Sequence, residues 1–185
     1  MTAPPRAGIE WDDAQLADRV IERIVDVADF PEPGVLFRDI TPVLADAEAF
    51  TAVVTELAAL SGDADLVAGI EARGFLLGAA VAVVAGTGVV PVRKAGKLPR
   101  VACSRTYDLE YGSATLELPA DTVDPGARVF VVDDVLATGG TAAAACDLLT
   151  EAGAAVVGMG VLLELTALAG RERLGAVALH ALLQA

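Results

Sequence analysis

Short runs rich in valine and other apolar residues recur along the chain, and segments with the composition of helices separate them. The runs are DLVAGI, VVPV, RVFVVDD and AVVGMGVLLE. Strands that are apolar on both faces are typical of a parallel sheet covered by helices, because neither face meets water. A chain of 185 residues is long enough to bury the core of one such domain. The sequence therefore predicts a single α/β domain over residues 1–185, built on a parallel sheet that helices flank.

The spacing of apolar residues predicts where those helices lie. Apolar residues recur at helical intervals over residues 12–28, which predicts an amphipathic helix, and the pattern of residues 46–60 predicts a second one. The uncharged stretch 74–92 approaches the roughly 20 residues that cross a bilayer. Glycines and a proline divide it, however, so we expect a buried helix over 75–85, a buried strand over 88–92 and no membrane span.

Two segments depart from the alternation of strands and helices. FPEPGVLFRDITPVL contains three prolines and a glycine, which exclude a long helix. Between VVPV and RVFVVDD, the alternating segment SATLELP predicts an antiparallel excursion off the parallel sheet. We therefore expect both segments to lie away from the main sheet.

Charge limits the choice of partners. Acidic residues outnumber basic ones by 26 to 13, which gives a formal net charge of -13. Nucleic acids and acidic membranes bind basic surfaces, so neither is expected as a partner. Five of the 13 basic residues nevertheless form an island within thirteen positions: Arg93, Lys94, Lys97, Arg100 and Arg105. In so acidic a chain, we expect this basic island to serve an anion.

The cysteines and the histidine give no sign of a metal site. Cys103 and Cys146 do not form a CxxC pair and have no histidine cluster beside them. They predict reduced thiols in a cytoplasmic protein. The start, MTAPPRAGIEWDD, lacks the pattern of a secretion signal. His180 lies in the apolar segment AVALHALLQA and is expected to pack or to lie at the surface rather than to catalyse.

The segment VFVVDDVLATGGTAAAACDLL, residues 129–149, combines a strand, a glycine turn and a helix. Where such a helix begins, free backbone N–H groups and the positive end of the helix dipole can bind an anion. Gly139 and Gly140 would let the backbone come close to it, and Thr138 and Thr141 could donate from their hydroxyls. The glycines are adjacent and no lysine follows them, so the turn is neither a P-loop nor a GxGxxG motif.

Asp133 and Asp134 come just before this turn. Carboxylates accept hydrogen bonds from the vicinal hydroxyls of a ribose, as an acidic residue does in dinucleotide folds. A ribose 5-phosphate would satisfy both the acids and the turn. The alternative is that the acids merely end the strand and cap the helix. Two consecutive carboxylates followed by ATGGT favour the ligand over the cap.

On these features the chain resembles the type I phosphoribosyltransferases. VFVVDDVLATGGTAAAA is similar to their signature for phosphoribosyl diphosphate (PRPP). The segments that resemble adenine-specific members, in the same order, are FPEPGVLFRDITPVL, GIEARGFLLGAAVA, PVRKAGKLPR, YDLEYGSATLEL and LLELTALAGRERL, and together they cover roughly residues 29–180. The resemblance implies a Rossmann-like parallel sheet with a small hood (about 1–45) and a flexible antiparallel lid (about 93–118). It also implies a homodimer.

The resemblance assigns roles to particular residues. Those implied to hold the 5-phosphate of ribose are Ala137, Thr138, Gly139, Gly140 and Thr141. Those implied to bind pyrophosphate are Glu71, Ala72, Arg73 and Gly74 in one loop, with Arg93, Lys94 and Lys97 in the lid. Those implied to surround adenine are Val35, Phe37, Arg38 and Val135. The implied catalytic residues are Glu110, Asp133 and Asp134, and Tyr111 would order the lid.

The reaction that the resemblance implies joins adenine to PRPP and gives AMP and pyrophosphate. Mg²⁺ would be held mainly by PRPP oxygens and water, with no direct protein ligand, because it dehydrates reluctantly. Glu110 would act as a general acid or base near N7 of the purine. Two alternatives stay open: a phosphoribosyltransferase for xanthine, hypoxanthine or a pyrimidine, and a PRPP-sensing regulator without catalysis. The absence of an appended helix-turn-helix module disfavours the regulator.

Overall fold

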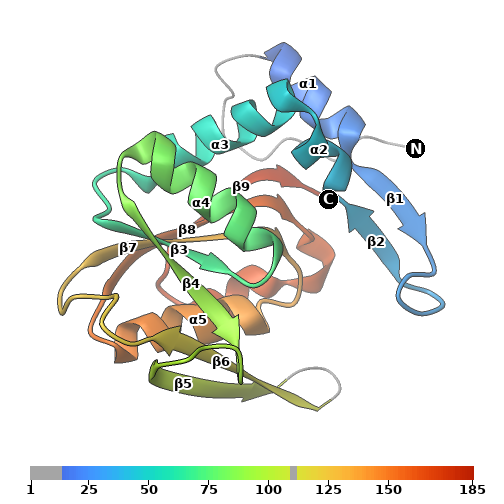
Figure 1. The fold of residues 1–185 in the computed structure, drawn as a ribbon. Coiled ribbons are helices and arrows are strands. Elements are labelled where there is room, and N and C mark those ends of the chain that lie inside the picture. The colour runs from blue at the N-terminus through green and yellow to red at the C-terminus, as the bar shows by residue number, and fades with distance from the viewer. Residues whose placement is uncertain (1–13, 109–111) are drawn as a thin grey trace.

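Residues 14–108 and 112–185 are described by a computed structural model, shown in Figure 1. A seven-stranded sheet runs through the molecule in the order β5-β6-β4-β3-β7-β8-β9. Its strands are β3 (Leu66–Ile70), β4 (Gly88–Lys94), β5 (Val101–Asp108), β6 (Ser113–Pro119), β7 (Arg128–Leu136), β8 (Ala155–Glu164) and β9 (Leu179–Gln184). Strands β4, β3, β7, β8 and β9 are parallel, and β5 and β6 are antiparallel. The predicted parallel sheet is therefore confirmed.

Helices cover both faces of the sheet (Figure 1). They are α3 (Ala47–Ser61), α4 (Arg73–Ala85) and α5 (Gly140–Glu151), with the short 3₁₀ helices η1 (Thr166–Leu168) and η2 (Gly170–Leu174) near the end of the chain. Strand β7 contributes to the core on each side, because successive side chains of a strand point to opposite faces. Val129 and Val131 pack in the core that contains α5, whereas Phe130 and Val132 pack in the core that contains α3 and α4.

Most of the predicted helices and strands are confirmed. The helices expected over residues 46–60 and 75–85 correspond to α3 and α4, and the strand expected over 88–92 lies within β4. Helix α4 stops at Gly86, whose φ of 73° is in the left-handed region that favours glycine. Among the described residues, no helix is long and apolar enough to cross a membrane.

The N-terminal part differs from the single helix predicted over residues 12–28. Its elements are α1 (Ala14–Arg23), β1 (Val25–Ala28), β2 (Leu36–Asp39) and α2 (Thr41–Ala45). Strands β1 and β2 form an antiparallel pair, here called the N-terminal hairpin, in which Val27 lies opposite Phe37. This pairing overrides the helical spacing of Val27, because a β-branched residue is readily accepted in a strand. No long helix forms across the proline-rich segment, as predicted.

The segment SATLELP forms β6, which is antiparallel to both β5 and β4. The expectation that it leaves the sheet is wrong. Strand β4 continues beyond its pairing with β3, and its last residues, Arg93 and Lys94, pair with β6 instead. Backbone groups at that edge would otherwise lack partners. Strands β5 and β6 therefore extend the same sheet on one side.

Candidate functional site

The carboxyl ends of β3 and β7 open onto two adjoining cavities. The smaller cavity has a volume of about 310 Å³ and is lined by Asp133, Asp134 and the turn 137–141. The larger cavity has a volume of about 970 Å³ and is lined partly by β2 of the N-terminal hairpin. Arg73, Val135 and most of the turn line both cavities, so the two meet there.

All five residues predicted to hold a 5-phosphate line the smaller cavity. Gly139 has a φ of 79°, which favours glycine, and α5 begins at the next residue. The first N–H groups of α5 lack partners within the helix and are available to an anion. The hydroxyl oxygens of Thr141 and Tyr107 lie 3.0 Å apart, which joins β5 to this helix end. The turn therefore has the geometry of a phosphate site.

Asp133 and Asp134 lie within β7, which continues beyond them to Leu136, so they do not end the strand. The backbone N–H of Asp134 donates a hydrogen bond of 2.9 Å to Asp133 Oδ1. Burial and the neighbouring charge of Asp134 raise the pKa of Asp133 well above its ordinary value. Two adjacent carboxylates in such a place favour a ligand that donates hydrogen bonds or carries positive charge.

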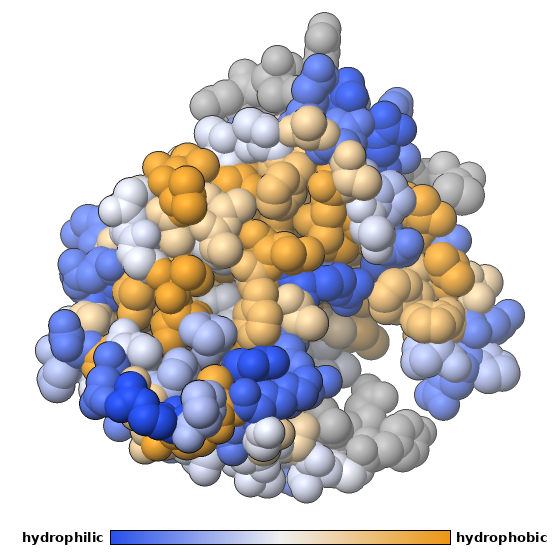
Figure 2. Space-filling model, viewed as in Figure 1, coloured by the Kyte–Doolittle hydropathy of each residue, from blue (hydrophilic) through white to orange (hydrophobic). Residues whose placement is uncertain are grey.

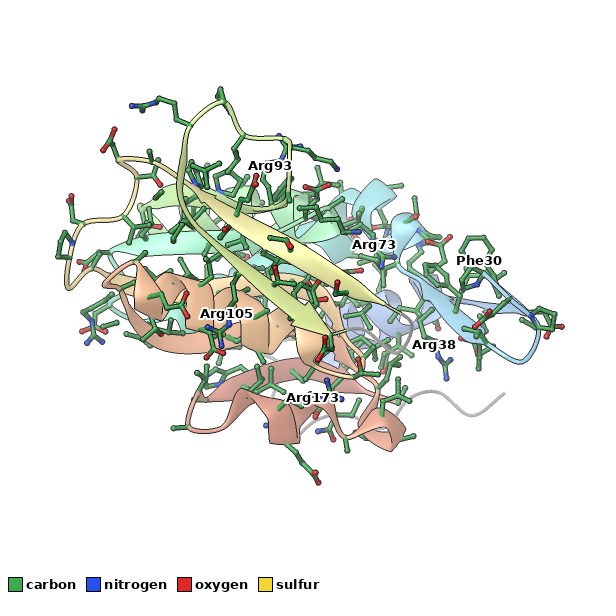
Figure 3. The ribbon with its side chains drawn as sticks, turned by 90° about the horizontal axis from the view of Figure 1, so that it is seen from below. Phe30, Arg38, Arg73, Arg93, Arg105 and Arg173 are labelled. Carbon is green, nitrogen blue, oxygen red and sulfur yellow. The ribbon has the colours of Figure 1, made fainter. Side chains whose placement is uncertain are left out.

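Arg73 connects this acidic pair to the N-terminal hairpin. Its Nε lies 2.8 Å from Oδ2 of the buried Asp134. The contact is an ion pair and not a hydrogen bond, so Asp134 Oδ2 is left without a hydrogen-bond partner in the described structure. The same guanidinium stands 5.3 Å from the ring centre of Phe37, within the range of a cation–π contact. Figure 3 shows Arg73 between the sheet and the hairpin that carries Phe30 and Arg38.

The loop before α4 packs tightly against β7. The peptide bond between Glu71 and Ala72 is cis. A Cβ built on Gly74 would lie 2.8 Å from both Asp133 Oδ1 and the carbonyl oxygen of Val132. Only glycine therefore fits at position 74, and it brings the start of α4 directly against the acidic pair.

Glu71 binds the basic segment of the predicted lid through its carboxylate. Its carboxylate accepts hydrogen bonds from Lys94 N at 3.1 Å and Arg93 Nε at 3.4 Å, and it forms an ion pair with Lys97. Burial acts to raise the pKa of Glu71, but the hydrogen bonds from Lys97 and Lys94 N outweigh it, so the pKa is lowered. Lys94 lines the smaller cavity, whereas Arg93 and Lys97 line neither cavity. In this state, two of the three lid cations are held by a carboxylate.

The rest of the basic island is engaged with acids as well. Arg100 lies 2.8 Å from Asp121, and Arg105 pairs with Asp147 at 2.7 Å and with Glu151, both in α5. Within the described structure, Lys94 is the member of the island without an ion pair. The charge available to an anion is therefore smaller than the sequence suggested.

The larger cavity contains the four residues predicted to surround adenine: Val35, Phe37, Arg38 and Val135. Phe30 meets Phe37 edge-on, with 5.1 Å between ring centres and 75° between the rings. Arg38 forms an ion pair with Asp26 across the hairpin. The ring of Phe37 offers an apolar surface suited to a planar ligand.

Glu110 and Tyr111 lie outside the described residues. Tyr107 and Arg173 line the cavities although the sequence did not single them out as ligands. Tyr107 belongs to the quoted YDLEYG segment and could have been found there. Arg173 also lies in a quoted segment, LLELTALAGRERL, but nothing in that segment marks it as a ligand.

No group of three or more His, Cys, Asp or Glu side chains in the described ranges could hold a metal ion. Cys103 and Cys146 are free thiols, and burial, with the charge of Asp147, raises the pKa of Cys146 to about 12. The ring of His180 lies 6.3 Å from that of Phe130, which confirms a packing role.

The sequence matches a protein-family model and is similar to proteins of known family. Residues 43–179 match the family model described as phosphoribosyl transferase domain. The chain is 62% identical to the adenine phosphoribosyltransferase of Kineococcus radiotolerans over 174 residues, 91% of this chain and 94% of that protein. It is 60% identical to that of Saccharopolyspora erythraea over the full length of both chains.

Solved structures of similar proteins share the fold. The adenine phosphoribosyltransferase of Rhodothermus marinus superimposes with a TM-score of 0.88 at 45% identity, covering 94% of this chain and 100% of that one. The Saccharomyces cerevisiae protein, complexed with adenine and an imino-altritol bisphosphate, gives a TM-score of 0.86 at 35% identity, covering 92% and 100%.

Proposed function

The chain belongs to the phosphoribosyl transferases and, within them, to the adenine phosphoribosyltransferase family, and on this premise we propose the reaction that it catalyses. It transfers the 5-phosphoribosyl group of PRPP to adenine and releases AMP and pyrophosphate, a step of purine salvage. One structural observation supports this reaction independently of the family assignment. The cavity lined by the acidic pair and by residues 137–141, here called the anion turn, adjoins the cavity lined by Phe37. Val135 and Arg73 line both cavities.

We propose that the smaller cavity takes the ribose and its phosphate. The turn 137–141 and the start of α5 hold the 5-phosphate, because their N–H groups and helix dipole favour an anion. Asp133 and Asp134 accept hydrogen bonds from the ribose hydroxyls. Asp134 Oδ2 supports this role, because it is buried and has no hydrogen-bond donor of its own in the described residues. A hydroxyl of the sugar would supply one.

Adenine lies in the larger cavity, between Phe37 and Val135, with Val35 and Arg38 beside it. An aromatic ring stacked on a base contributes about 1–3 kcal/mol. Backbone groups of β2 read the amino edge of the base. A site that forms hydrogen bonds to that edge rejects a 6-oxo purine strongly, because its buried partners would be left unpaired.

The diphosphate is bound by the loop 71–74 and by the lid. Arg73 lines both cavities and Lys94 lines the smaller one, so both are placed to meet an anion there. Arg93 and Lys97 would transfer from Glu71 to the diphosphate when PRPP arrives. The exchange replaces one anionic partner by another, so Arg93 and Lys97 are not left unpaired.

The proposed cofactor is Mg²⁺, held mainly by PRPP oxygens and water. The donor set fits this, because the buried Asp134 Oδ2 has no hydrogen-bond donor of its own among the described residues and can accept from a metal-bound water as well as from the sugar. When bound, the ion neutralises the diphosphate leaving group. The chain's own residues do the rest. The acidic pair favours positive charge on the ribose ring as the diphosphate departs. Glu110 acts as a general acid or base near N7 of the purine.

The assembly and the compartment are also proposals. Side chains of α4 and β4 leave an exposed apolar strip, and Figure 2 shows apolar residues gathered over α4. The strip consists of Leu76, Val83, Val84 and Val89, of which Val83 is 81% exposed. Burial of such a strip against a second copy supports a homodimer. The unpaired thiols of Cys103 and Cys146 fit the reducing cytoplasm.

Turnover of PRPP with adenine, hypoxanthine, guanine and xanthine, each with Mg²⁺ and then with the ion chelated, tests the proposal. We expect AMP from adenine alone, and only with Mg²⁺ present. Turnover of a 6-oxo purine without turnover of adenine would keep the PRPP site and refute the base pocket. PRPP or AMP binding without any turnover would favour a PRPP sensor.

A further inference from the structure

Arg173, in η2, differs from the other arginines of the described structure. All the others form ion pairs with a carboxylate: Arg19, Arg23, Arg38, Arg73, Arg93, Arg100, Arg105, Arg128 and Arg171. Arg173 has no ion pair and no side-chain hydrogen bond among the described residues. In a chain with a formal net charge of -13, a guanidinium without an acidic partner is unusual.

The guanidinium of Arg173 lies against the first turn of α5. A Cβ built on Gly140 would be 3.5 Å from Arg173 Nη1, and Arg173 lines the larger cavity together with Gly140 and Thr141. Figure 3 shows it on the C-terminal segment beside α5. The start of a helix carries partial positive charge, so a second positive group there is unfavourable unless an anion lies between them.

The backbone of η2, which carries Arg173, is held in place by its neighbours. A Cβ built on Gly170 would be only 2.1 Å from the carbonyl oxygen of Ala137, so η2 begins in direct backbone contact with the anion turn. Leu174 is buried in the core beside α5. Arg171 forms a bidentate pair with the buried Glu164, at 3.0 and 2.6 Å. The backbone at Arg173 is therefore fixed relative to the turn before any ligand binds, and its exposed side chain is accessible to a ligand.

We propose that Arg173 is a further ligand of the 5-phosphate of PRPP and AMP, an inference that rests on the proposed function of the turn. The phosphate is a dianion. The N–H groups of the turn and of α5 supply neutral donors, and Arg173 supplies the positive charge that these lack. A guanidinium is suited to this because its planar array of donors matches a phosphate in a bidentate contact.

The test compares Arg173→Gln and Arg173→Lys with Arg128→Gln. Arg128 pairs with Asp63 at the amino end of β7 and lines neither cavity, so its variant matches the change in net charge. Dissociation constants for AMP and for pyrophosphate are measured by calorimetry, with the thermal unfolding midpoint as a check on folding. Because a hydrogen bond to a charged group contributes about 1.5–3 kcal/mol, Arg173→Gln is expected to weaken AMP binding about 10- to 100-fold. Pyrophosphate binding is expected to change less than about twofold, because pyrophosphate binds elsewhere.

Arg173→Lys keeps the charge without the planar donors and should lie between the wild type and Arg173→Gln. Arg128→Gln should bind both ligands as the wild type does. Unchanged AMP binding by Arg173→Gln, or an equal loss of AMP and pyrophosphate binding, would overturn the inference while the wild type still makes AMP from PRPP and adenine. If the wild type makes no AMP, the proposed function fails and this inference fails with it.

Discussion

Arg73, which lines both cavities, forms an ion pair with Asp134, with 2.8 Å between Nε and Oδ2. The guanidinium therefore neutralises a carboxylate that the ribose hydroxyls are proposed to use. It also covers the ring of Phe37, on which adenine is proposed to stack. A diphosphate that attracts Arg73 would free both surfaces at once, which links occupation of one cavity to the readiness of the other.

Arg73→Gln removes this charge and should lower kcat/KM for PRPP by about 100-fold, as the loss of one preorganised donor at developing charge does. Steady-state kinetics with PRPP varied at saturating adenine measures the effect. Arg128→Gln, which removes an arginine from a distant surface pair, serves as the control. A variant within threefold of the wild type would exclude Arg73 from the proposed diphosphate site.

Asp133→Asn should make the protein more stable and far less active. Burial and the charge of Asp134 raise the pKa of Asp133, so its ionised form destabilises the folded state. The amide oxygen of asparagine can still accept the hydrogen bond from Asp134 N. We expect a rise of about 3 °C in the unfolding midpoint at pH 7, corresponding to about 1 kcal/mol. Turnover should fall at least about 100-fold.

The pH dependence of that gain follows from the direction of the pKa shift. Below 3.8, the ordinary value, Asp133 is protonated in both the folded and the unfolded state, so the wild type and the variant should differ little. As the pH rises from there to the raised pKa of the folded state, the wild type loses stability relative to the variant. Above the raised pKa the difference is constant. A variant less stable than the wild type at pH 7 would contradict this account.

The sequence predicted the elements whose signals are local and strong. The valine-rich runs specified the parallel strands, because a strand buried on both faces needs apolar residues throughout. The turn 137–141 was recognised from its glycines, and Gly139 has the positive φ that a glycine signal implies. The acidic pair was recognised from two adjacent carboxylates in an apolar run.

What the sequence did not reveal depends on contacts between distant segments. The N-terminal hairpin arises from pairing of β1 with β2, which the helical spacing of residues 12–28 does not encode. The ion pair between Lys97 and Glu71 joins the loop after β4 to the loop after β3. Arg173 approaches the anion turn only because η2 packs on it. None of these contacts leaves a periodic pattern in the chain.

Glu164→Ala should destabilise the C-terminal segment. Glu164 is 4% exposed and accepts hydrogen bonds from Arg171 and from Gln184. Removing it leaves the Arg171 guanidinium without its carboxylate, although Nη1 still donates to the Leu179 carbonyl oxygen, and leaves Gln184 Nε2 without that acceptor. We expect a loss of about 3 kcal/mol in the free energy of unfolding, measured by urea denaturation at pH 7. Glu172→Ala, an exposed neighbour in η2, should cost less than about 0.5 kcal/mol.

The contribution of Glu164 should also depend on pH. The hydrogen bonds from Arg171 lower its pKa below the ordinary value of 4.5. The stabilisation is therefore fully present above 4.5 and is lost as the pH falls from there through the lowered pKa of the folded state. A difference between wild type and Glu164→Ala that stayed constant down to the lowered pKa and below it would show that packing, not charge, carries the effect.

Gly170→Ala should disturb the anion turn. Its Cβ would approach the carbonyl oxygen of Ala137 to 2.1 Å, so the backbone of the turn must shift. We expect a loss of about 2 kcal/mol in stability and a rise of about tenfold in KM for PRPP. Gly126→Ala is the matched control. Gly126 has a φ of 84° but nothing within 4 Å, so its variant should lose about 1 kcal/mol through backbone strain and keep KM unchanged.

The direct junction of the two cavities has a consequence for inhibitor design. Arg73, Val135 and most of the turn line both cavities, so no partition separates a group bound on the acidic pair from a ring bound on Phe37. A single molecule that joins an anionic sugar mimic to a purine-like ring could occupy both. Its second half would bind at the high effective concentration set by the short linker, so its affinity should exceed that of either half by orders of magnitude.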